Sequence, residues 1–336
     1  MGAKRGESGL CFVMGVDKPS GMTSHDVVNR VRRIFGERRV GHTGTLDPLA
    51  SGAMALCVGA ATRLDAHMVL HDKTYQVRVT FGSATDTDDS EGEVIRRASV
   101  PEEAYDPQWA GVRTAFLIGK QSQVPPLYSA IKKNGVKAYE AARQGKDFDL
   151  PAREIEIYDA QFKSLQIEQG CLSWDLQLSV SKGTYIRSIA RDLGESLGSA
   201  AHVSALRRIS SGNLDITDCV TLEQLEQHGL SCALDPVYLL GYPMAFLTDD
   251  QQRAVLCGQK LSARALTFYQ APRRVDEADC GPRRGARPLC SDLQDGQMVS
   301  LVYGNTLQAL YTYQQQRTGL VPACVFSQGV LRGQGV

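Results

Sequence analysis

The 336-residue sequence predicts an α+β fold in two domains. Strand and helix patterns mix without the regular βαβ rhythm of a doubly wound parallel sheet. Residues 75–81 (YQVRVTF) and 174–180 (WDLQLSV) alternate apolar and polar side chains, as half-buried strands do. After about residue 235 the pattern changes to short strand-like pieces such as QMVSLVY, ALYTYQ and ACVFS. Because the chain also exceeds the usual size of a single core, we expect domains at 1–235 and 236–336.

The N-terminal part predicts a strand, a turn and a helix. Residues 11–16 (CFVMGV) form an apolar run typical of a buried strand, and Pro and Gly within 17–24 indicate a turn. Ser24 is the expected N-cap of the helix, and Gly36 is the expected residue after its end. The apolar face holds Val27, Val28, Val31, Ile34 and Phe35, and the opposite face holds Arg30, Arg32 and Arg33.

Three loops of different character follow. Residues 41–52 (GHTGTLDPLASG) contain three Gly and one Pro and lead into an apolar strand at 53–59. The acidic segment 85–93 (TDTDDSEGE) is expected to be a solvated loop that cannot lie on a polyanion. Residues 121–153 carry six Lys/Arg against three Asp/Glu. The Arg/Gly/Pro-rich stretch at about 271–295 is expected to be a flexible insertion.

Composition excludes several classes of protein. Hydrophobic residues make up 43% and charged residues 22%, as in globular proteins, and no apolar run approaches the ~18 residues of a membrane span. The N-terminus lacks the apolar segment of a signal peptide, so we expect a cytoplasmic protein. Lys+Arg and Asp+Glu number 37 each, but a neutral total can hide a basic face. Nine Cys without a CxxC pair predict thiols and no metal site.

One carboxylate stands out once the common motifs are excluded. The sequence has no GxGxxG, GxxxxGK[ST], HExxH or GxSxG motif, so no nucleotide cofactor or zinc ion is expected. Asp47 lies in the glycine-rich loop and could attack an electrophilic sugar carbon, as carboxylates do in retaining glycosidases. The alternative, which composition alone favours, is that Asp47 only builds a turn before Pro48.

Six motifs together identify a family. They are KPSGMTS (18–24), GHTGTLDPLASG (41–52), DKTY (72–75), QVPPLYSAIKKNG (123–135), SKGTYIRSIARDLGESLG (181–198) and HVSALRR (202–208). In this order, over roughly residues 10–215, they resemble the TruB-type tRNA pseudouridine synthases. The resemblance implies the pseudouridine-synthase fold, with a mixed, mostly antiparallel central sheet. It also implies a small β-rich, PUA-like C-terminal domain, which the last hundred residues match only loosely.

The resemblance implies isomerisation of a tRNA T-loop uridine, at position 55 of tRNA, to pseudouridine. The glycosidic C–N bond breaks, the uracil rotates and a C–C bond forms, without a cofactor. The target base must flip out of its stack, which costs a few kcal/mol. Residues 121–153 would be a mobile insertion that clamps the RNA. The expected partner is the T-arm stem-loop of tRNA, bound by a monomer that needs no protein partner.

The family match assigns roles to individual residues. Asp47, Tyr75 and Arg187 would be catalytic, with Asp47 acting at the sugar C1′ and Arg187 keeping that carboxylate ionised. Substrate-binding residues would be His42, Tyr75, Tyr185 and Leu206. RNA-backbone contacts would come from Arg30, Arg33, Lys132, Lys133, Lys137, Arg207 and Arg208. Each residue also has an ordinary explanation: Tyr75 and Leu206 as core residues, Tyr185 and Arg187 as a helix start, and the lysines as a solvated loop.

Two other functions remain open at this point. One is an RNA-binding or tRNA-remodelling protein that catalyses no reaction. The presence of Asp47, Tyr75 and Arg187 together argues against this function, because RNA binding alone does not require these three residues. The other is a guide-RNA-dependent pseudouridine synthase subunit. For that subunit a fuller PUA domain would be expected than this C-terminus offers.

Overall fold

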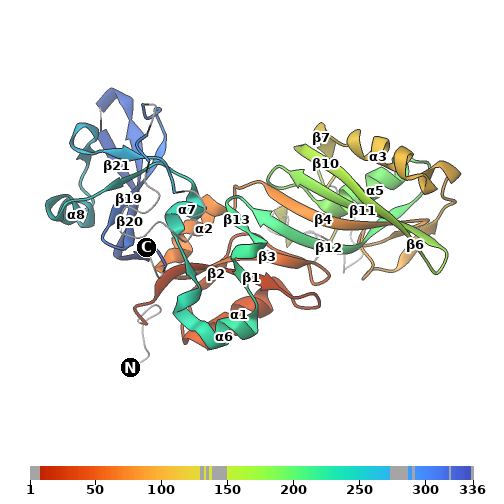
Figure 1. Cartoon of the computed structure of the whole chain (residues 1–336), viewed down its shortest axis with the longest axis horizontal. Helices are drawn as coiled ribbons and strands as arrows, with labels where there is room; N and C mark the ends of the chain where they lie inside the picture. The colour runs from red at the N-terminus through yellow and green to blue at the C-terminus, as the bar shows by residue number, and fades with distance from the viewer. Residues whose placement is uncertain are drawn as a thin grey trace. The chain divides into compact units, whose positions relative to one another are not determined.

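The computed structural model describes residues 8–128, 132–133, 136–137, 150–272, 287–289, 292–317 and 319–333. The chain divides into two compact units (Figure 1). Unit 1 comprises Met1–Asp47, Gly52–Leu70 and Ser211–Val336, and unit 2 comprises Pro48–Ser51 and His71–Ser210. The division into a catalytic domain and a PUA-like domain at residue 235 stays a prediction.

The N-terminal strand is the centre of unit 1. β1 (Cys11–Lys18) pairs antiparallel with β3 (Ser51–Gly59), and β2 (Val40–His42) pairs antiparallel with β3. The short strands β14 (Cys219–Val220) and β15 (Ala233–Leu234) also pair with β1. Seven of the eight residues of β1 are buried, so both faces of the strand are covered, which explains why its sequence is a continuous apolar run.

Helix α1 (Ser24–Phe35) begins one residue earlier than predicted, so Ser24 as N-cap is wrong. Thr23 is the cap: its hydroxyl accepts from the Asp26 amide at 3.1 Å, and the Asp26 carboxylate accepts from the Thr23 amide at 3.0 Å. The Ser24 hydroxyl instead binds both backbone groups of Leu46, at 2.8 and 2.9 Å. Gly36 ends the helix as predicted, in the left-handed conformation (φ 62°) that glycine adopts without steric cost.

The C-terminal part of unit 1 is rich in β-structure. β19 (Met298–Tyr303), β20 (Thr306–Gln314) and β21 (Gly319–Leu331) form antiparallel neighbours. These strands share an apolar core with the N-terminal strands, in which Val13 and Cys57 belong to the same cluster as Leu307 and Phe326. The remaining elements of this part are β16 (Met244–Phe246), β17 (Leu261–Ser262), β18 (Phe268–Tyr269) and α8 (Asp249–Leu256).

Unit 2 contains an antiparallel sheet covered by helices (Figure 1). β7 (Gly119–Gln123), β10 (Arg153–Glu168), β11 (Cys171–Val180) and β4 (Lys73–Phe81) are successive neighbours, and β12 (Ala201–Ser211) pairs with β4. Its core is built around Trp174, which meets Phe81, Trp109 and Phe162 edge to face and donates from Nε1 to the Ala104 carbonyl at 3.0 Å.

The described elements confirm the predicted α+β class and the mixed, mostly antiparallel sheet. The remaining helices are α2 (Asp65–Met68), α3 (Pro107–Ala115), α5 (Ile186–Ser196), α6 (Leu222–His228) and α7 (Pro236–Leu240). The remaining strands are β5 (Ser83–Thr85), β6 (Val94–Arg97), β8 (Lys132–Lys133), β9 (Val136–Lys137) and β13 (Leu214–Asp215).

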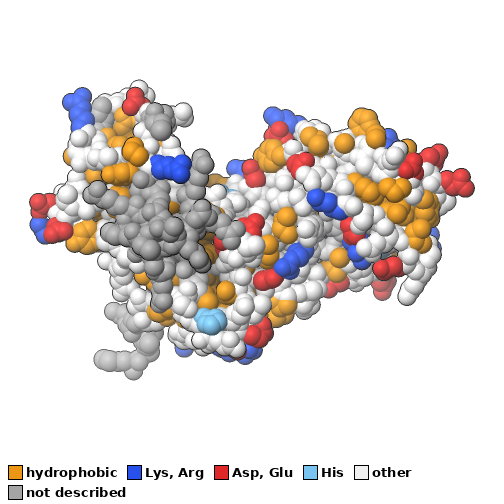
Figure 2. Space-filling view, in the orientation of Figure 1, with side chains coloured by type: hydrophobic (Ala, Val, Ile, Leu, Met, Phe, Trp, Pro, Cys, Tyr) orange, Lys and Arg blue, Asp and Glu red, His pale blue; other side chains and the backbone are white. Residues whose placement is uncertain are grey.

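On the face drawn in Figure 2, positive and negative side chains are interspersed, and hydrophobic side chains gather over α3. Val112 and Phe116 of that helix are exposed. Most of the predicted insertions at 121–153 and 271–295 lies outside the described residues. No helix in the described part is long and apolar enough to cross a membrane.

Candidate active site

The loop that carries Asp47 is held in place from both sides. At its start, His42 of β2 stands opposite Leu56 of β3, and its Nδ1 accepts from the Gly44 amide at 3.4 Å. Just before Asp47, Leu46 is buried and its backbone is bound by Ser24 of α1. Asp47 itself is half-buried and is the last residue of the first segment of unit 1. The loop therefore presents this carboxylate from a fixed backbone.

Tyr75 lies in the middle of the sheet of unit 2. It belongs to β4 and stands opposite Leu178 of β11. Its ring is 7% exposed and shares a sheet face with Val77 and Val79, because side chains two residues apart in a strand point the same way. This position fits both the core aromatic and the active-site tyrosine that the sequence suggested.

Tyr185 is fixed at the N-terminus of α5 by a side chain from another strand. Gln123 of β7 accepts from the Tyr185 amide at 2.9 Å and donates to the Tyr185 carbonyl at 3.0 Å. The Arg153 guanidinium lies 5.7 Å from the centre of the Tyr185 ring, within the range of a cation–π contact. The half-buried ring of Tyr185 is therefore held in a defined orientation.

Arg187, in the first turn of α5, is buried among hydrogen-bond acceptors. Its Nη1 donates to the Thr87 carbonyl at 2.9 Å, and its Nη2 donates to the Tyr128 carbonyl at 3.0 Å. Nη1 also lies 3.4 Å from Oδ2 of Asp89. These contacts fix the orientation of the guanidinium plane. A residue that served only to begin a helix would not need its side chain fixed in this way.

The expectation that 85–93 is a solvated acidic loop is wrong for two of its carboxylates. Asp88 and Asp89 are 9% and 4% exposed, and Asp88 pairs with Arg191 at 3.0 Å. Burial raises the pKa of Asp88 to about 6, against the opposing charges of Arg191 and Arg187. The sequence did contain a signal, because Arg187 and Arg191 are four residues apart and so share one helix face.

The candidate RNA-backbone residues have different surroundings. Arg30 Nη2 pairs with Glu226 Oε1 of α6 at 2.5 Å, and Arg33 is exposed. Arg207 of β12 donates to the Ser51 hydroxyl at 3.4 Å. Arg208 is 2% exposed, and its assignment as a phosphate contact stays a prediction. The side chains of Lys132, Lys133 and Lys137 lie outside the described residues.

The predicted site residues are distributed over both units. Tyr75, Tyr185, Arg187 and Leu206 belong to unit 2, whereas His42 and Asp47 belong to unit 1. Leu206 is half-buried in β12. In the described part of the chain, no three His, Cys, Asp or Glu side chains are grouped so that they could hold a metal ion.

Family models match two adjoining stretches of the chain. Residues 32–186 match the model described as TruB family pseudouridylate synthase (N terminal domain). Residues 187–238 match the tRNA pseudouridylate synthase B C-terminal domain. A protein of Corynebacterium aurimucosum named tRNA pseudouridine synthase B is 40% identical over 252 residues, 75% of this chain and 84% of that protein. The chain belongs to the TruB family.

Other relatives and solved structures agree with this membership. A protein of Thermobifida fusca named tRNA pseudouridine synthase B is 40% identical over 74% of this chain and 86% of that protein. A protein of the same name from Syntrophotalea carbinolica is 44% identical over 64% of this chain and 68% of that protein. A chain in the crystal structure of a Cbf5–Nop10–Gar1 complex has the same fold, with TM-score 0.65 and 22% identity over 96% of this chain and 87% of that one. This TruB-family member is thus a pseudouridine synthase, an isomerase.

Proposed function

We propose that this synthase converts the T-loop uridine at position 55 of tRNA to pseudouridine. The observation that carries the proposal is the 40% identity to a tRNA pseudouridine synthase B, over 84% of that protein's length. Chains in the solved structures of an H/ACA RNP and of a Cbf5–Nop10–Gar1 complex share the fold at only 22% identity. Sequence similarity therefore favours the synthase that acts on tRNA without a guide RNA.

The reaction needs a group that stabilises or attacks the sugar, and we assign that role to Asp47. The bond between C1′ and N1 breaks, the uracil rotates, and C5 bonds to C1′. The proton on C5 is lost and N1 gains one, so substrate and product have the same atoms. The fixed backbone of Leu46 supports the assignment, because a catalytic carboxylate must be held in place while the base rotates.

Tyr75 and Arg187 complete the proposed catalytic set. We assign the Tyr75 ring to stacking on the uracil, together with Tyr185, and Leu206 to the uracil edge. We assign Arg187 as the cation that favours the charged form of Asp47. The three contacts of Arg187 within unit 2 support a positioned rather than a mobile guanidinium.

The target nucleotide must leave its stack before it can react. We propose that His42 helps to keep it flipped out. Contacts from Arg33, Arg207 and the lysines of 121–153 to phosphates would offset the cost of unstacking.

The direct test is incubation of the purified protein with an unmodified tRNA transcript, followed by carbodiimide-dependent primer extension. The expected result is a carbodiimide-dependent reverse-transcription stop that maps a pseudouridine to position 55 and is absent with Asp47→Asn. Binding without any stop would favour the protein without chemistry. A stop that requires an added guide RNA would favour the guide-dependent subunit. Either outcome contradicts the proposal.

A further inference from the structure

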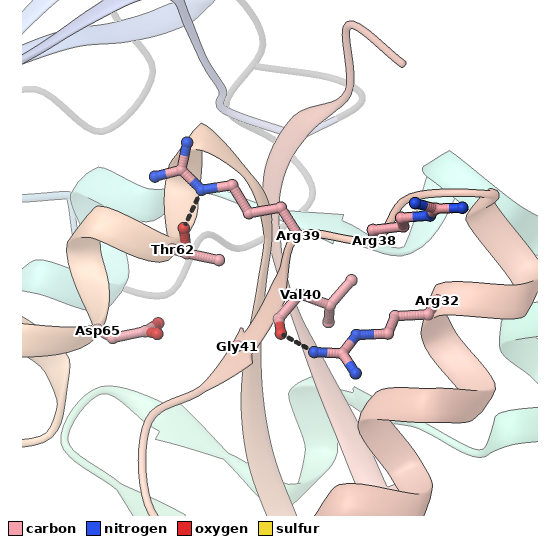
Figure 3. Close-up of a pocket in the computed structure, with 7 residues that line it drawn as sticks. All are labelled: Arg32, Arg38, Arg39, Val40, Gly41, Thr62 and Asp65. Carbon is pink, nitrogen blue, oxygen red and sulfur yellow. Dashed lines mark hydrogen bonds between the residues drawn. The ribbon is translucent and has the colours of Figure 1, made fainter. Parts of the chain in front are cut away.

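Unit 1 contains a basic pocket that none of the proposed catalytic residues lines. Its cavity volume is about 680 Å³, and it lies beside β2 (Figure 3). The residues that line it, which we call the arginine pocket, are Arg32, Arg38, Arg39, Val40, Gly41, Thr62 and Asp65. Three guanidinium groups against one carboxylate give the wall an excess of positive charge. Such a wall attracts anions.

The three arginines have no ion-pair partner among the described residues. Arg30, which lies in the same helix as Arg32 but does not line the pocket, differs from these arginines because it forms an ion pair with Glu226. The nearest acid in sequence, Glu37, is occupied elsewhere: it accepts from the Arg39 amide at 2.8 Å and from the Ser8 hydroxyl. Glu37 therefore fixes the backbone that presents Arg38 and Arg39 without neutralising them.

Hydrogen bonds orient the guanidinium groups of Arg32 and Arg39 but do not use all of their N–H donors. Arg39 donates from Nε to the Thr62 hydroxyl at 2.7 Å, so its two Nη groups are not used by that bond. Arg32 donates to Asn29 Oδ1 at 3.1 Å and to the Val40 carbonyl at 3.4 Å. Figure 3 shows Arg39 and Thr62 on one side of β2 and Arg32 and Arg38 on the other.

Between these two sides the pocket is lined by Val40 and Gly41 of β2. A Cβ on Gly41 would lie 2.4 Å from Oδ2 of Asp65, so a larger residue there would displace the Asp65 side chain. Burial raises the pKa of Asp65 against the opposing charge of Arg39, which is another residue of the pocket. None of the lining residues is aromatic, so the pocket offers no platform on which a base could stack.

These features fit a sugar–phosphate backbone better than a base or a nucleotide cofactor. Planar guanidinium groups bind phosphate oxygens in pairs, and contacts of this kind position a nucleic acid without reading its sequence. Resting on the proposed function, we propose that the arginine pocket binds backbone phosphates of the RNA substrate outside the target nucleotide. Arg38 and Arg39 carry the contact, and Thr62 is a positioning residue for Arg39.

The test compares Arg38→Ala, Arg39→Ala and the double variant with Arg97→Ala, which removes an exposed arginine of β6 in unit 2. For each protein, the Kd for a tRNA transcript is measured over a range of salt concentrations, together with kcat, KM and the melting temperature. We expect each single variant to raise Kd about 10-fold, the energy of a hydrogen bond to a charged group. The slope of log Kd against log salt should fall by about 1 per arginine, with kcat at saturating tRNA unchanged.

Each other outcome overturns the proposal. If the pocket variants bind tRNA like Arg97→Ala and keep its salt slope, no phosphate of the RNA lies there. The melting temperature is also compared with and without inorganic phosphate. If the pocket variants lose only the increase in melting temperature that phosphate gives the wild type, and bind tRNA normally, the pocket binds a free anion instead. A fall in kcat with unchanged Kd would place the arginines in the chemistry. Failure of the proposed function is distinct, because the wild-type protein would then form no pseudouridine at position 55.

Discussion

Arg187 of α5 and Asp89 of the loop after β5 form a buried ion pair, with 3.4 Å between Nη1 and Oδ2. The two side chains are 7% and 5% exposed, so neither charge is solvated. A buried pair of this kind contributes little net stability, but removing one partner leaves an uncompensated charge in the interior. The pair therefore ties the acidic loop to helix α5, which contains Arg187 and has Tyr185 as its N-cap.

The first prediction follows from this pair. Arg187→Ala should lower the free energy of unfolding by about 3 to 5 kcal/mol, because Asp89 is left buried without its partner. The double variant with Asp89→Ala should lose less than the sum of the two single losses. Urea unfolding of the four proteins measures this coupling, and strictly additive losses would show that the contact carries no energy.

Arg187→Lys separates charge from geometry. A lysine keeps the positive charge but places it on one nitrogen, whereas Arg187 reaches the Thr87 carbonyl and Asp89 from Nη1 and the Tyr128 carbonyl from Nη2. We expect a folded protein whose turnover recovers poorly while its tRNA affinity stays near that of the wild type. Full activity of Arg187→Lys would show that only the charge matters.

Asp88 predicts a pH dependence of stability. Its pKa is raised by burial from 3.8 to about 6, so the native state holds this proton more tightly than the unfolded chain. The resulting stabilisation is complete below pH ~4 and is lost as the pH rises through about 6. The wild type should therefore lose about 3 kcal/mol relative to Asp88→Asn between pH 3.5 and 7. Urea unfolding at both pH values tests this, and a constant difference would contradict it.

Tyr75→Phe tests the hydroxyl of a buried ring. Because the ring is 7% exposed and packed in the sheet, phenylalanine should keep both the fold and the stacking surface. We expect turnover to fall severely while tRNA affinity changes little. Single-turnover tritium release from C5 of the uracil gives the rate, and an unchanged rate would leave Tyr75 as a core aromatic.

His42 is predicted to act by its flat ring. His42→Phe should keep much of the activity, whereas His42→Ala should impair base flipping without changing the chemical step on an unstacked substrate. Fluorescence of 2-aminopurine beside the target uridine follows flipping independently of turnover. Normal flipping with failed chemistry in His42→Ala would instead move this histidine into the catalytic set.

Local patterns in the sequence predicted much of the fold. The alternating strands at 75–81 and 174–180 lie within β4 and β11, and the apolar run 11–16 lies within β1. Each of these strands was predicted from the polarity pattern of a few adjacent residues. By contrast, the predicted N-cap at Ser24 was wrong: Thr23 forms the capping box with Asp26, and the Ser24 hydroxyl binds the distant Leu46.

The candidate site could be predicted only in part, for the same physical reason. The family resemblance singled out Asp47, Tyr75 and Arg187, but it did not predict that Asp89 pairs with Arg187. Asp88 and Asp89 were expected to be solvated because a run of acids usually is, whereas tertiary contacts bury Asp89 against Arg187 and Asp88 against Arg191. The arginine pocket was likewise hidden, because Thr62 and Asp65 reach Arg39 through the fold rather than through sequence spacing.

The central claim is that Asp47 carries the isomerisation, and Asp47→Asn tests it most directly. The variant keeps the size of the side chain and the hydrogen bonds that hold Leu46, so the loop should remain in place. Pseudouridine formation at position 55 is measured by tritium release under multiple turnover, with tRNA affinity measured on the same preparation. We predict no detectable turnover and an affinity within a few-fold of the wild type. Measurable multiple turnover by Asp47→Asn, in protein free of contaminating synthase, would contradict the claim.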